Sequence, residues 1–187
     1  MDANYGIIMW FYVNSWDKNY NSQKYILSRY LNDTETSQDI EAYLDATNNN
    51  LVVNFAQQST MSTSTIQNIP LQKWVCLGIS KFNNTIDIYI DGKLADTKIG
   101  IDTAEDPDPT SSFILHGFTD GSGTKTKGFD GYTRNFKYYS RPLSPIEVYN
   151  VYKSSANGTI LDNLIGNYKL KLSFFKNDEE VAEVGLG

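Results

Sequence analysis

The stretch that decides the fold runs from Trp74 to Leu94 and reads WVCLGISKFNNTIDIYIDGKL. Aliphatic residues occupy every second position in both of its halves, namely Val75, Leu77 and Ile79, then Ile86, Ile88 and Ile90. A period of two predicts two strands. Asp91-Gly92 follows the second strand and is the strongest short hairpin signal, so residues 93–98 are expected to run back antiparallel.

Strand-like sequence continues on both sides of this stretch. The run from Ile7 to Val13 is uninterruptedly apolar, which predicts a central strand covered on both faces. Shorter runs bounded by Asn, Asp, Ser and Gly predict further strands at 24–30, 40–45, 51–55, 112–118, 131–139, 168–176 and 181–186. Thirteen Tyr and nine Phe strengthen an all-β assignment, because aromatic side chains suit a pleated, half-buried surface.

One short helix is predicted from Ser144 to Lys153. Ser144 is a good N-cap residue, Pro145 suits the first helical position, and Glu147 completes a capping box. The apolar spacing suggests that Ile146 and Tyr149, with Val148 and Tyr152, face the core.

Charge and cysteine content exclude several classes of protein. The chain has 187 residues, a formal net charge of -6 and no cluster of Lys and Arg, so a nucleic-acid partner is not expected. Cys76 is the only cysteine, which rules out an intrachain disulfide and a thiolate-rich zinc site. We expect no signal peptide and no membrane insertion by this chain. The chain starts abruptly on a strand, which suggests that it is a piece of a longer protein. The possibility of a membrane anchor upstream of Met1 is left open.

The sequence resembles a known family. The segment from Trp74 to Leu94, and Phe129 to Val148, reading FDGYTRNFKYYSRPLSPIEV, are similar to the two signatures of LamG-like domains of the concanavalin A-like lectin/glucanase superfamily. Thr133 stands where that family usually has an aliphatic residue. The opening from Trp10 to Trp16 and the tail from Tyr168 to Leu186 resemble versions encoded by large DNA viruses of eukaryotes.

This resemblance implies a two-sheet antiparallel β-sandwich of the jelly-roll type. We expect residues 1–187 to form one domain, with residues 160–187 as C-terminal strands that complete or flank it. The superfamily includes glycan binders, glycosidases, adhesion modules and scaffolds, so the fold alone does not define the function.

An enzymatic role is not expected. Glycosidases of this superfamily carry paired carboxylates, usually as E-x-D-x-x-E on one strand, and that motif is absent. The nearest approach is Glu41 to Asp45, preceded by Asp33, Glu35 and Asp39, which we interpret as solvent-facing charges. His116 is the only histidine, and we interpret it as a structural residue on a strand.

Two groups of residues are candidates for binding. Aromatic rings and polar groups alternate at Trp16, Asp17, Tyr20 and Tyr25, a mixture that suits a sugar. The preferred interpretation is that Trp16 and Tyr25 pack on the edge of the sandwich while the polar residues form turns. The acidic loop from Gly100 to Thr110 offers hard oxygen ligands for calcium. Those ligands are Asp102, Glu105, Asp106 and Asp108, and the alternative is a solvated loop.

The sequence therefore predicts a non-enzymatic recognition module that binds glycan or protein, in a virion or in host cytoplasm if the chain is viral. A structural scaffold or capsid-associated interaction domain is the alternative. A glycoside hydrolase ranks below both, and calcium is the only cofactor considered.

Overall fold

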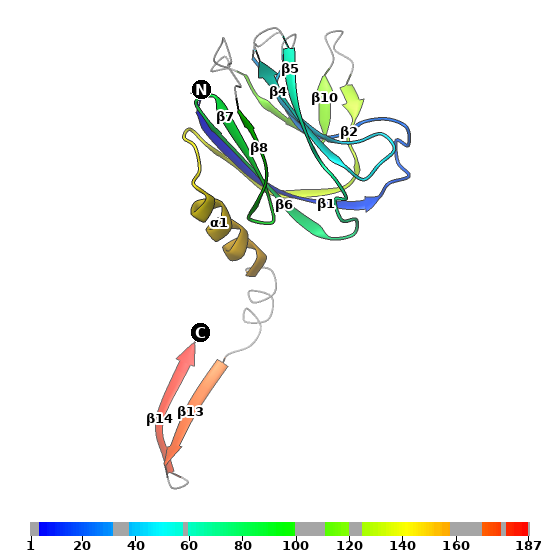
Figure 1. Cartoon of the computed structure of the whole chain (residues 1–187). Helices are drawn as coiled ribbons and strands as arrows, with labels where there is room; N and C mark the ends of the chain where they lie inside the picture. Colours follow the sequence, from blue (N-terminus) through cyan, green and yellow to red (C-terminus); the bar gives the residue numbers. More distant parts are fainter. Residues whose placement is uncertain are drawn as a thin grey trace. The chain divides into compact units, whose positions relative to one another are not determined.

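Two five-stranded sheets form the body of the protein (Figure 1). The computed structural model describes residues 4–31, 38–57, 60–99, 111–119, 125–157, 170–176 and 179–186. Sheet I has the order β12 (Asp130–Tyr139), β1 (Tyr5–Ser15), β6 (Trp74–Phe82), β7 (Thr85–Ile90), β8 (Lys93–Ile99). Sheet II has the order β5 (Thr60–Ile66), β4 (Leu51–Gln57), β3 (Gln38–Leu44), β2 (Lys24–Tyr30), β9 (Phe113–Leu115). All neighbouring strands are antiparallel, which confirms the predicted sandwich.

The chain divides into two compact units, Met1–Tyr149 and Asn150–Gly187. The first unit holds both sheets and a small hairpin of β10 (Gly117–Thr119) and β11 (Lys125–Lys127). The second unit contains an antiparallel hairpin of β13 (Leu170–Lys176) and β14 (Glu179–Leu186). The expectations that residues 1–187 form one domain and that 160–187 complete or flank the sandwich stay predictions.

The hydrophobic core is supplied by alternate residues of both sheets. On β1 the core residues are Tyr5, Ile7, Met9, Phe11 and Val13, and on β3 they are Ile40, Ala42 and Leu44. Strand β1 lies between β12 and β6, so the apolar run is central and buried as predicted. Because successive side chains point to opposite faces, each strand also presents a second row away from the core. These two outer rows are where ligand-binding residues can lie.

A charged pair is enclosed in this core. Arg29 and Asp39 are 0% and 2% exposed, and Arg29 Nε donates to Asp39 Oδ2 at 2.7 Å. The guanidinium carbon lies 4.5 Å from the ring centroid of Tyr5 and 4.7 Å from that of Phe113. Burial of a charge is tolerated here because the carboxylate neutralises it and the rings pack around it.

The predicted hairpin at Asp91-Gly92 joins β7 to β8. Both residues have positive φ, 51° and 75°, which is the geometry of a type I′ turn. Asp91 also fixes the adjacent strand, since its carboxylate accepts a hydrogen bond from the Cys76 backbone N–H at 2.9 Å.

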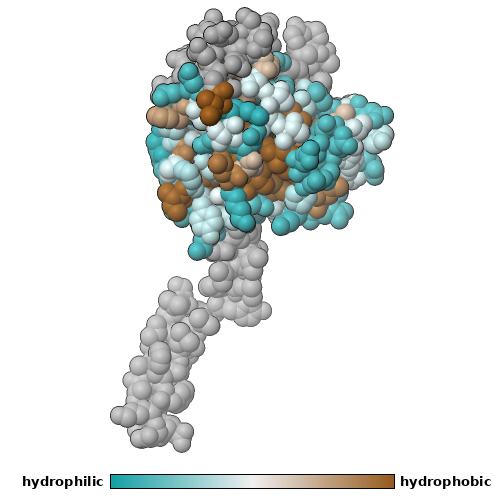
Figure 2. Space-filling model, in the orientation of Figure 1, coloured by the Kyte–Doolittle hydropathy of each residue, from teal (hydrophilic) through white to brown (hydrophobic). Residues whose placement is uncertain are grey.

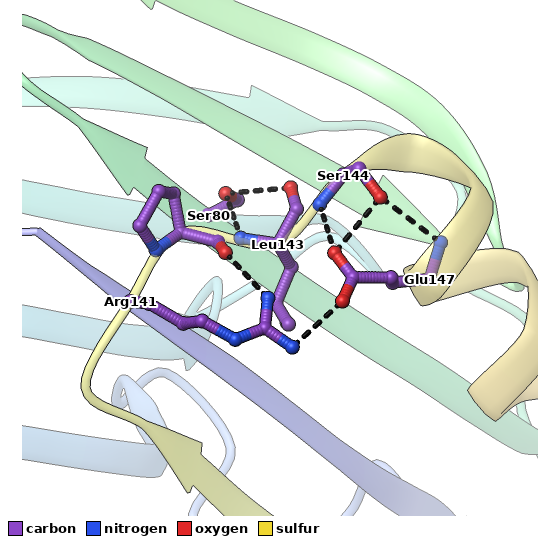
Figure 3. A network of polar contacts seen from close by, with 6 residues as sticks. Ser80, Arg141, Leu143, Ser144 and Glu147 are labelled. Carbon is purple, nitrogen blue, oxygen red and sulfur yellow. Dashed lines mark hydrogen bonds and ion pairs between the residues drawn. The ribbon is translucent and has the colours of Figure 1, made fainter.

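The helix α1 (Pro145–Asn157) begins with the predicted capping box (Figure 3). Glu147 Oε2 accepts from the Ser144 backbone N–H at 2.9 Å, and the Glu147 N–H donates to Ser144 Oγ at 3.4 Å. Arg141 adds an ion pair to Glu147 at 2.7 Å. The helix ends four residues beyond the predicted limit of Lys153.

The predicted buried face of this helix is partly wrong. Ile146 and Tyr149 are 62% and 42% exposed, whereas Val148 is fully buried. The first turn packs on the outer face of sheet I, where a Cβ built at Gly78 would lie 2.9 Å from Val148 Cγ1. Because Gly78 has no side chain, the outer face of sheet I has room at this point for Val148 of the helix.

One strand of sheet II was not predicted. Strand β5 has the sequence TMSTSTI, which contains mostly hydroxyl side chains. Among the described residues it lies at the edge of the sheet and pairs with β4, and several of its residues are exposed to solvent. An edge position does not demand the apolar alternation by which the other strands were recognised.

Candidate functional site

The outer face of sheet II carries a row of polar side chains from three adjacent strands. The register aligns Ser28 of β2, Glu41 of β3 and Asn54 of β4, and the next row aligns Tyr25 with Tyr43. We call these five residues the Glu41 face. They lie opposite the core because residues 40, 42 and 44 of β3 point inward.

Glu41 is the central group of this face. Asn54 Nδ2 donates to Glu41 Oε1 at 2.6 Å and lies 3.4 Å from the Tyr43 hydroxyl oxygen. The glutamate is only 7% exposed, and burial raises the pKa of its carboxyl, while the hydrogen bond from Asn54 acts in the opposite direction. The interpretation of Glu41 as a solvent-facing charge is therefore wrong.

Two tyrosines flank the glutamate. The rings of Tyr25 and Tyr43 lie 5.3 Å apart with an interplanar angle of 48°. The Tyr25 hydroxyl donates to Gln23 Oε1 at 2.8 Å. Burial raises the pKa of both phenols, so they are neutral donors at physiological pH.

This arrangement combines hydrogen-bonding groups with aromatic surface. Asn54 Oδ1 is buried and has no hydrogen-bond partner within the described residues. A carboxylate, an amide and two phenols provide both donors and acceptors for the hydroxyl groups of a ligand. The Glu41 face therefore offers hydrogen-bonding groups that match a polar molecule with several hydroxyls.

The same face lacks the geometry of a glycosidase as far as the structure describes it. Two carboxyls must stand about 5 to 10 Å apart across the scissile bond. Asp45 follows Glu41 by four strand positions, about 13 Å along an extended chain. It also caps its own turn, accepting from the Thr47 N–H at 2.9 Å. Asp39 is neutralised by Arg29 in the core.

The four predicted ligand residues lie in different surroundings. Trp16 packs against the core, and Lys24 Nζ lies 4.6 Å from its ring centroid. Asp17 is exposed and interacts with Ser15 Oγ at 3.2 Å. Tyr20 is 62% exposed, whereas Tyr25 is 7% exposed. Of the four, only Tyr25 belongs to the Glu41 face, and the binding roles of all four stay predictions.

Sequence reasoning missed Glu41, Tyr43 and Asn54 as a group. A signal existed, because Glu41 and Tyr43 alternate with the core residues Ile40 and Ala42. It could place the two on an outer face, but not bring Asn54 beside them, since that contact depends on the β3–β4 register.

The single histidine has a structural environment. His116 Nε2 lies 3.0 Å from Thr133 Oγ1, and the imidazole stacks on Phe129 with centroids 4.5 Å apart. Burial lowers the pKa of His116, with a smaller contribution from Lys18. His116 lies at a bend with φ 60° between β9 and β10, not inside a strand as predicted. The hydroxyl at Thr133 gives this departure from the family pattern a physical role.

Cys76 lacks the surroundings of a nucleophile. It is fully buried on β6, and burial raises the pKa of its thiol to about 12, with Asp91 adding to the shift. A thiol with this pKa is protonated at neutral pH.

Metal ligands are not grouped in the described ranges. There, no cluster of at least three His, Cys, Asp or Glu side chains could hold an ion. The predicted calcium ligands Asp102, Glu105, Asp106 and Asp108 lie outside the described residues, so that site stays a prediction. In the part of the chain that was searched, no helix has the length and apolar character needed to cross a bilayer.

Two antiparallel five-stranded sheets packed as a jelly roll define the class of concanavalin A-like sandwiches. The chain belongs to the concanavalin A-like lectin/glucanases superfamily, whose model matches residues 2–149. No match was found among curated proteins.

Solved structures with this fold include receptor-binding domains of botulinum neurotoxins. The serotype D ligand-binding domain in complex with N-acetylneuraminic acid has a TM-score of 0.65 and 14% identity over 82% of this chain and 37% of that one. The serotype G binding domain has a TM-score of 0.61 and 16% identity, with coverages of 82% and 37%. The chain thus spans little more than a third of these neighbours' length, and the likeness concerns the fold.

Proposed function

We propose that this protein is a non-enzymatic recognition module that binds glycan through the Glu41 face. The observation that carries the proposal is the nearly buried Glu41 carboxyl, held by Asn54 beside two tilted tyrosine rings. A glutamate that only solubilises the surface would keep its contact with water. The donors and acceptors of the Glu41 face match those of hydroxyl-rich ligands.

Further support comes from the structural neighbours. One of them is described as a ligand-binding domain in complex with N-acetylneuraminic acid, and others are described as receptor-binding domains. Glycan and protein surfaces are therefore the partners we propose, without nucleic acid and without membrane insertion by this chain. Association with a virion is also part of the proposal, and its support is the resemblance of the Trp10–Trp16 opening and the C-terminal tail.

A scaffold that binds neighbouring protein subunits is the second candidate. Several large hydrophobic side chains are exposed, among them Ile99 at 80%, Phe82 at 57% and Leu94 at 56%. Figure 2 shows separate hydrophobic patches among hydrophilic side chains on one face of the molecule. Exposed apolar patches of this kind can serve a protein interface.

A glycan array with and without EDTA tests the proposal. We expect reproducible binding to at least one neutral glycan, and a loss of about tenfold or more for Asn54→Ala, because the change removes hydrogen bonds from a desolvated site. Lys93→Ala, an exposed change on β8, is the matched control and should bind normally.

The same experiment can overturn the proposal. Silence on the array together with stable oligomers would favour the scaffold. Rapid hydrolysis of a β-glucan would contradict the non-enzymatic role. Loss of binding in EDTA would add weight to the predicted calcium site at Asp102, Glu105, Asp106 and Asp108.

A further inference from the structure

The outer face of sheet I carries a second group of side chains, whereas the Glu41 face belongs to sheet II. The register aligns Trp10 with Arg134, and the adjacent row aligns Trp74 and Tyr12 with Tyr132. We call these five residues the Arg134 platform. They come from the three adjacent strands β6, β1 and β12, so a rigid sheet fixes their spacing.

The guanidinium of Arg134 is held by aromatic rings. Its central carbon lies 4.2 Å from the Trp74 ring centroid and 5.2 Å from that of Trp10. The Tyr12 ring lies 5.5 Å from Trp74 and 6.2 Å from Tyr132. Stacking on indoles orients a guanidinium without using its N–H donors.

Those donors are unused within the described residues. There Arg134 makes no hydrogen bond and no ion pair, and its Nε is buried without a partner. Other arginines of the sandwich are engaged, since Arg29 bonds Asp39 and Arg141 bonds Glu147. A partly desolvated cation with free donors favours an anion, and the planar fork matches a carboxylate through two parallel bonds.

The rings around the cation indicate what kind of molecule carries that anion. Tyr132 is 64% exposed, and Tyr12 and Trp74 are half-buried. Amphipathic rings with accessible faces and phenolic hydroxyls suit the mixed apolar and hydroxyl surface of a pyranose. A small inorganic anion would make no use of them.

We propose that the Arg134 platform is a second binding site, selective for a sugar that carries a carboxylate. In this site the carboxylate accepts hydrogen bonds from the Arg134 guanidinium, and the sugar ring lies against the exposed face of Tyr132. The site is separate from the Glu41 face, which presents a carboxylate of its own and disfavours an acidic ligand.

Titration of the full chain with a matched pair of sugars tests this site. Glucuronic acid and glucose differ by a carboxylate, and the indoles of Trp10 and Trp74 report binding by their fluorescence. We expect a saturable change with glucuronic acid that weakens as salt is added, and a response to glucose at least about tenfold weaker. Equal responses to both sugars would overturn the proposal.

Variants assign the effect to the arginine. Arg134→Gln should weaken glucuronic acid binding about tenfold or more, and Arg134→Lys should retain part of it because a point charge remains. Lys137→Gln is the matched control, since Lys137 is exposed on the same strand, and it should leave binding unchanged. If Arg134→Gln lowers the melting temperature markedly, its loss of binding is not informative, and Arg134→Lys becomes the deciding variant. Binding of glucuronic acid by Arg134→Lys that is as strong as that of Lys137→Gln would contradict a site in which the guanidinium makes two bonds to the carboxylate.

Two further arms distinguish the Arg134 platform from a general anion site and from the Glu41 face. Sodium sulfate and sodium acetate should not reproduce the change, and an equal response to either would show a general anion site. Asn54→Ala should keep the response to glucuronic acid, so that failure of the Glu41 face and failure of the Arg134 platform are distinguishable. Loss of the response in Asn54→Ala would overturn the claim of a separate site.

Discussion

On the outer face of sheet I, small residues at Gly6, Gly78 and Ser80 admit Leu143 and Val148. The row of Ser28, Glu41 and Asn54 on sheet II is polar instead, and its Ser28 hydroxyl donates to the Gly117 carbonyl of β10. The first face is thus partly covered by the chain itself. The uncovered remainder holds a cation, Arg134, while the other face holds a carboxyl, Glu41. The difference shows that the two outer faces are covered by different chemistry, with apolar side chains of residues 143–148 on sheet I and a hydrogen bond to β10 on sheet II.

The largest expected effect concerns the covered part of sheet I. Gly78→Val would push against Val148 and Tyr89, whose atoms lie 2.9 and 3.3 Å from the position of a new Cβ. Overpacking of this kind should lower the free energy of unfolding by about 2 to 3 kcal/mol. Urea unfolding measures the loss.

Thr65→Ile on sheet II is the matched control. Thr65 is exposed on β5, so a larger β-branched side chain meets no cover there and should change stability by less than about 0.5 kcal/mol. Equal losses for the two variants would break the comparison between a covered and an exposed position.

A smaller effect is expected at Ser80. Its hydroxyl accepts from the Leu143 N–H and donates to the Leu143 carbonyl, both at 2.9 Å, in a buried position (Figure 3). Ser80→Ala leaves both backbone groups without that partner and should cost about 1 to 2 kcal/mol of unfolding free energy. Ser112→Ala, at an exposed position, should be neutral, and a neutral Ser80→Ala would show that water replaces the hydroxyl.

The next effect is a dependence of the free energy of unfolding on pH that arises from Glu41 on sheet II. Burial raises the pKa of Glu41, so its contribution to stability is fully present below the unfolded pKa and is lost as pH rises through the folded value. Glu41→Gln does not titrate. We therefore expect the free energy of unfolding of this variant to rise relative to that of the parent between pH 4 and pH 7. The gain should be smaller than the loss expected for Ser80→Ala. Urea unfolding at both pH values measures the gain.

Asp45→Asn should show the opposite trend. Backbone hydrogen bonding from Thr47 lowers the pKa of Asp45, so its contribution is present above the unfolded pKa and is lost as pH falls. This variant should lose stability relative to the parent at pH 7 and recover toward pH 3. If both variants follow the same trend, the contrast between a desolvated carboxyl on β3 and a capping carboxyl in the turn after it is wrong.

The sequence predicted the sandwich because its strands are defined by local patterns. The alternation around Leu77 and Ile88, the Asp91-Gly92 turn and the Ser144 cap each act within a few residues. The two candidate sites depend instead on register between strands. Asn54 reaches Glu41, and Arg134 reaches Trp74, only because residues far apart in sequence are aligned across a sheet.

Sequence reasoning also failed where the burial of a side chain depends on a residue that is distant in sequence but adjacent in the fold. The exposed Ile146 and the buried Val148 are both aliphatic, and it is Val148 that occupies the space above Gly78. Glu41 was interpreted as solvated because glutamate usually is. Its desolvation results from tertiary packing, which no single stretch encodes.

The smallest expected effect is an absence of reaction at Cys76, which shares a row of sheet I with Trp10 and Arg134. Burial raises the pKa of its thiol to about 12, while Arg134 acts weakly in the opposite direction. At pH 8 the thiol stays protonated and enclosed, so a thiol reagent should label the native chain only as fast as it unfolds. The urea-unfolded chain, labelled promptly, is the control. Fast labelling of the native protein would show that this row opens to solvent, and the Arg134 platform could not then be a rigid site.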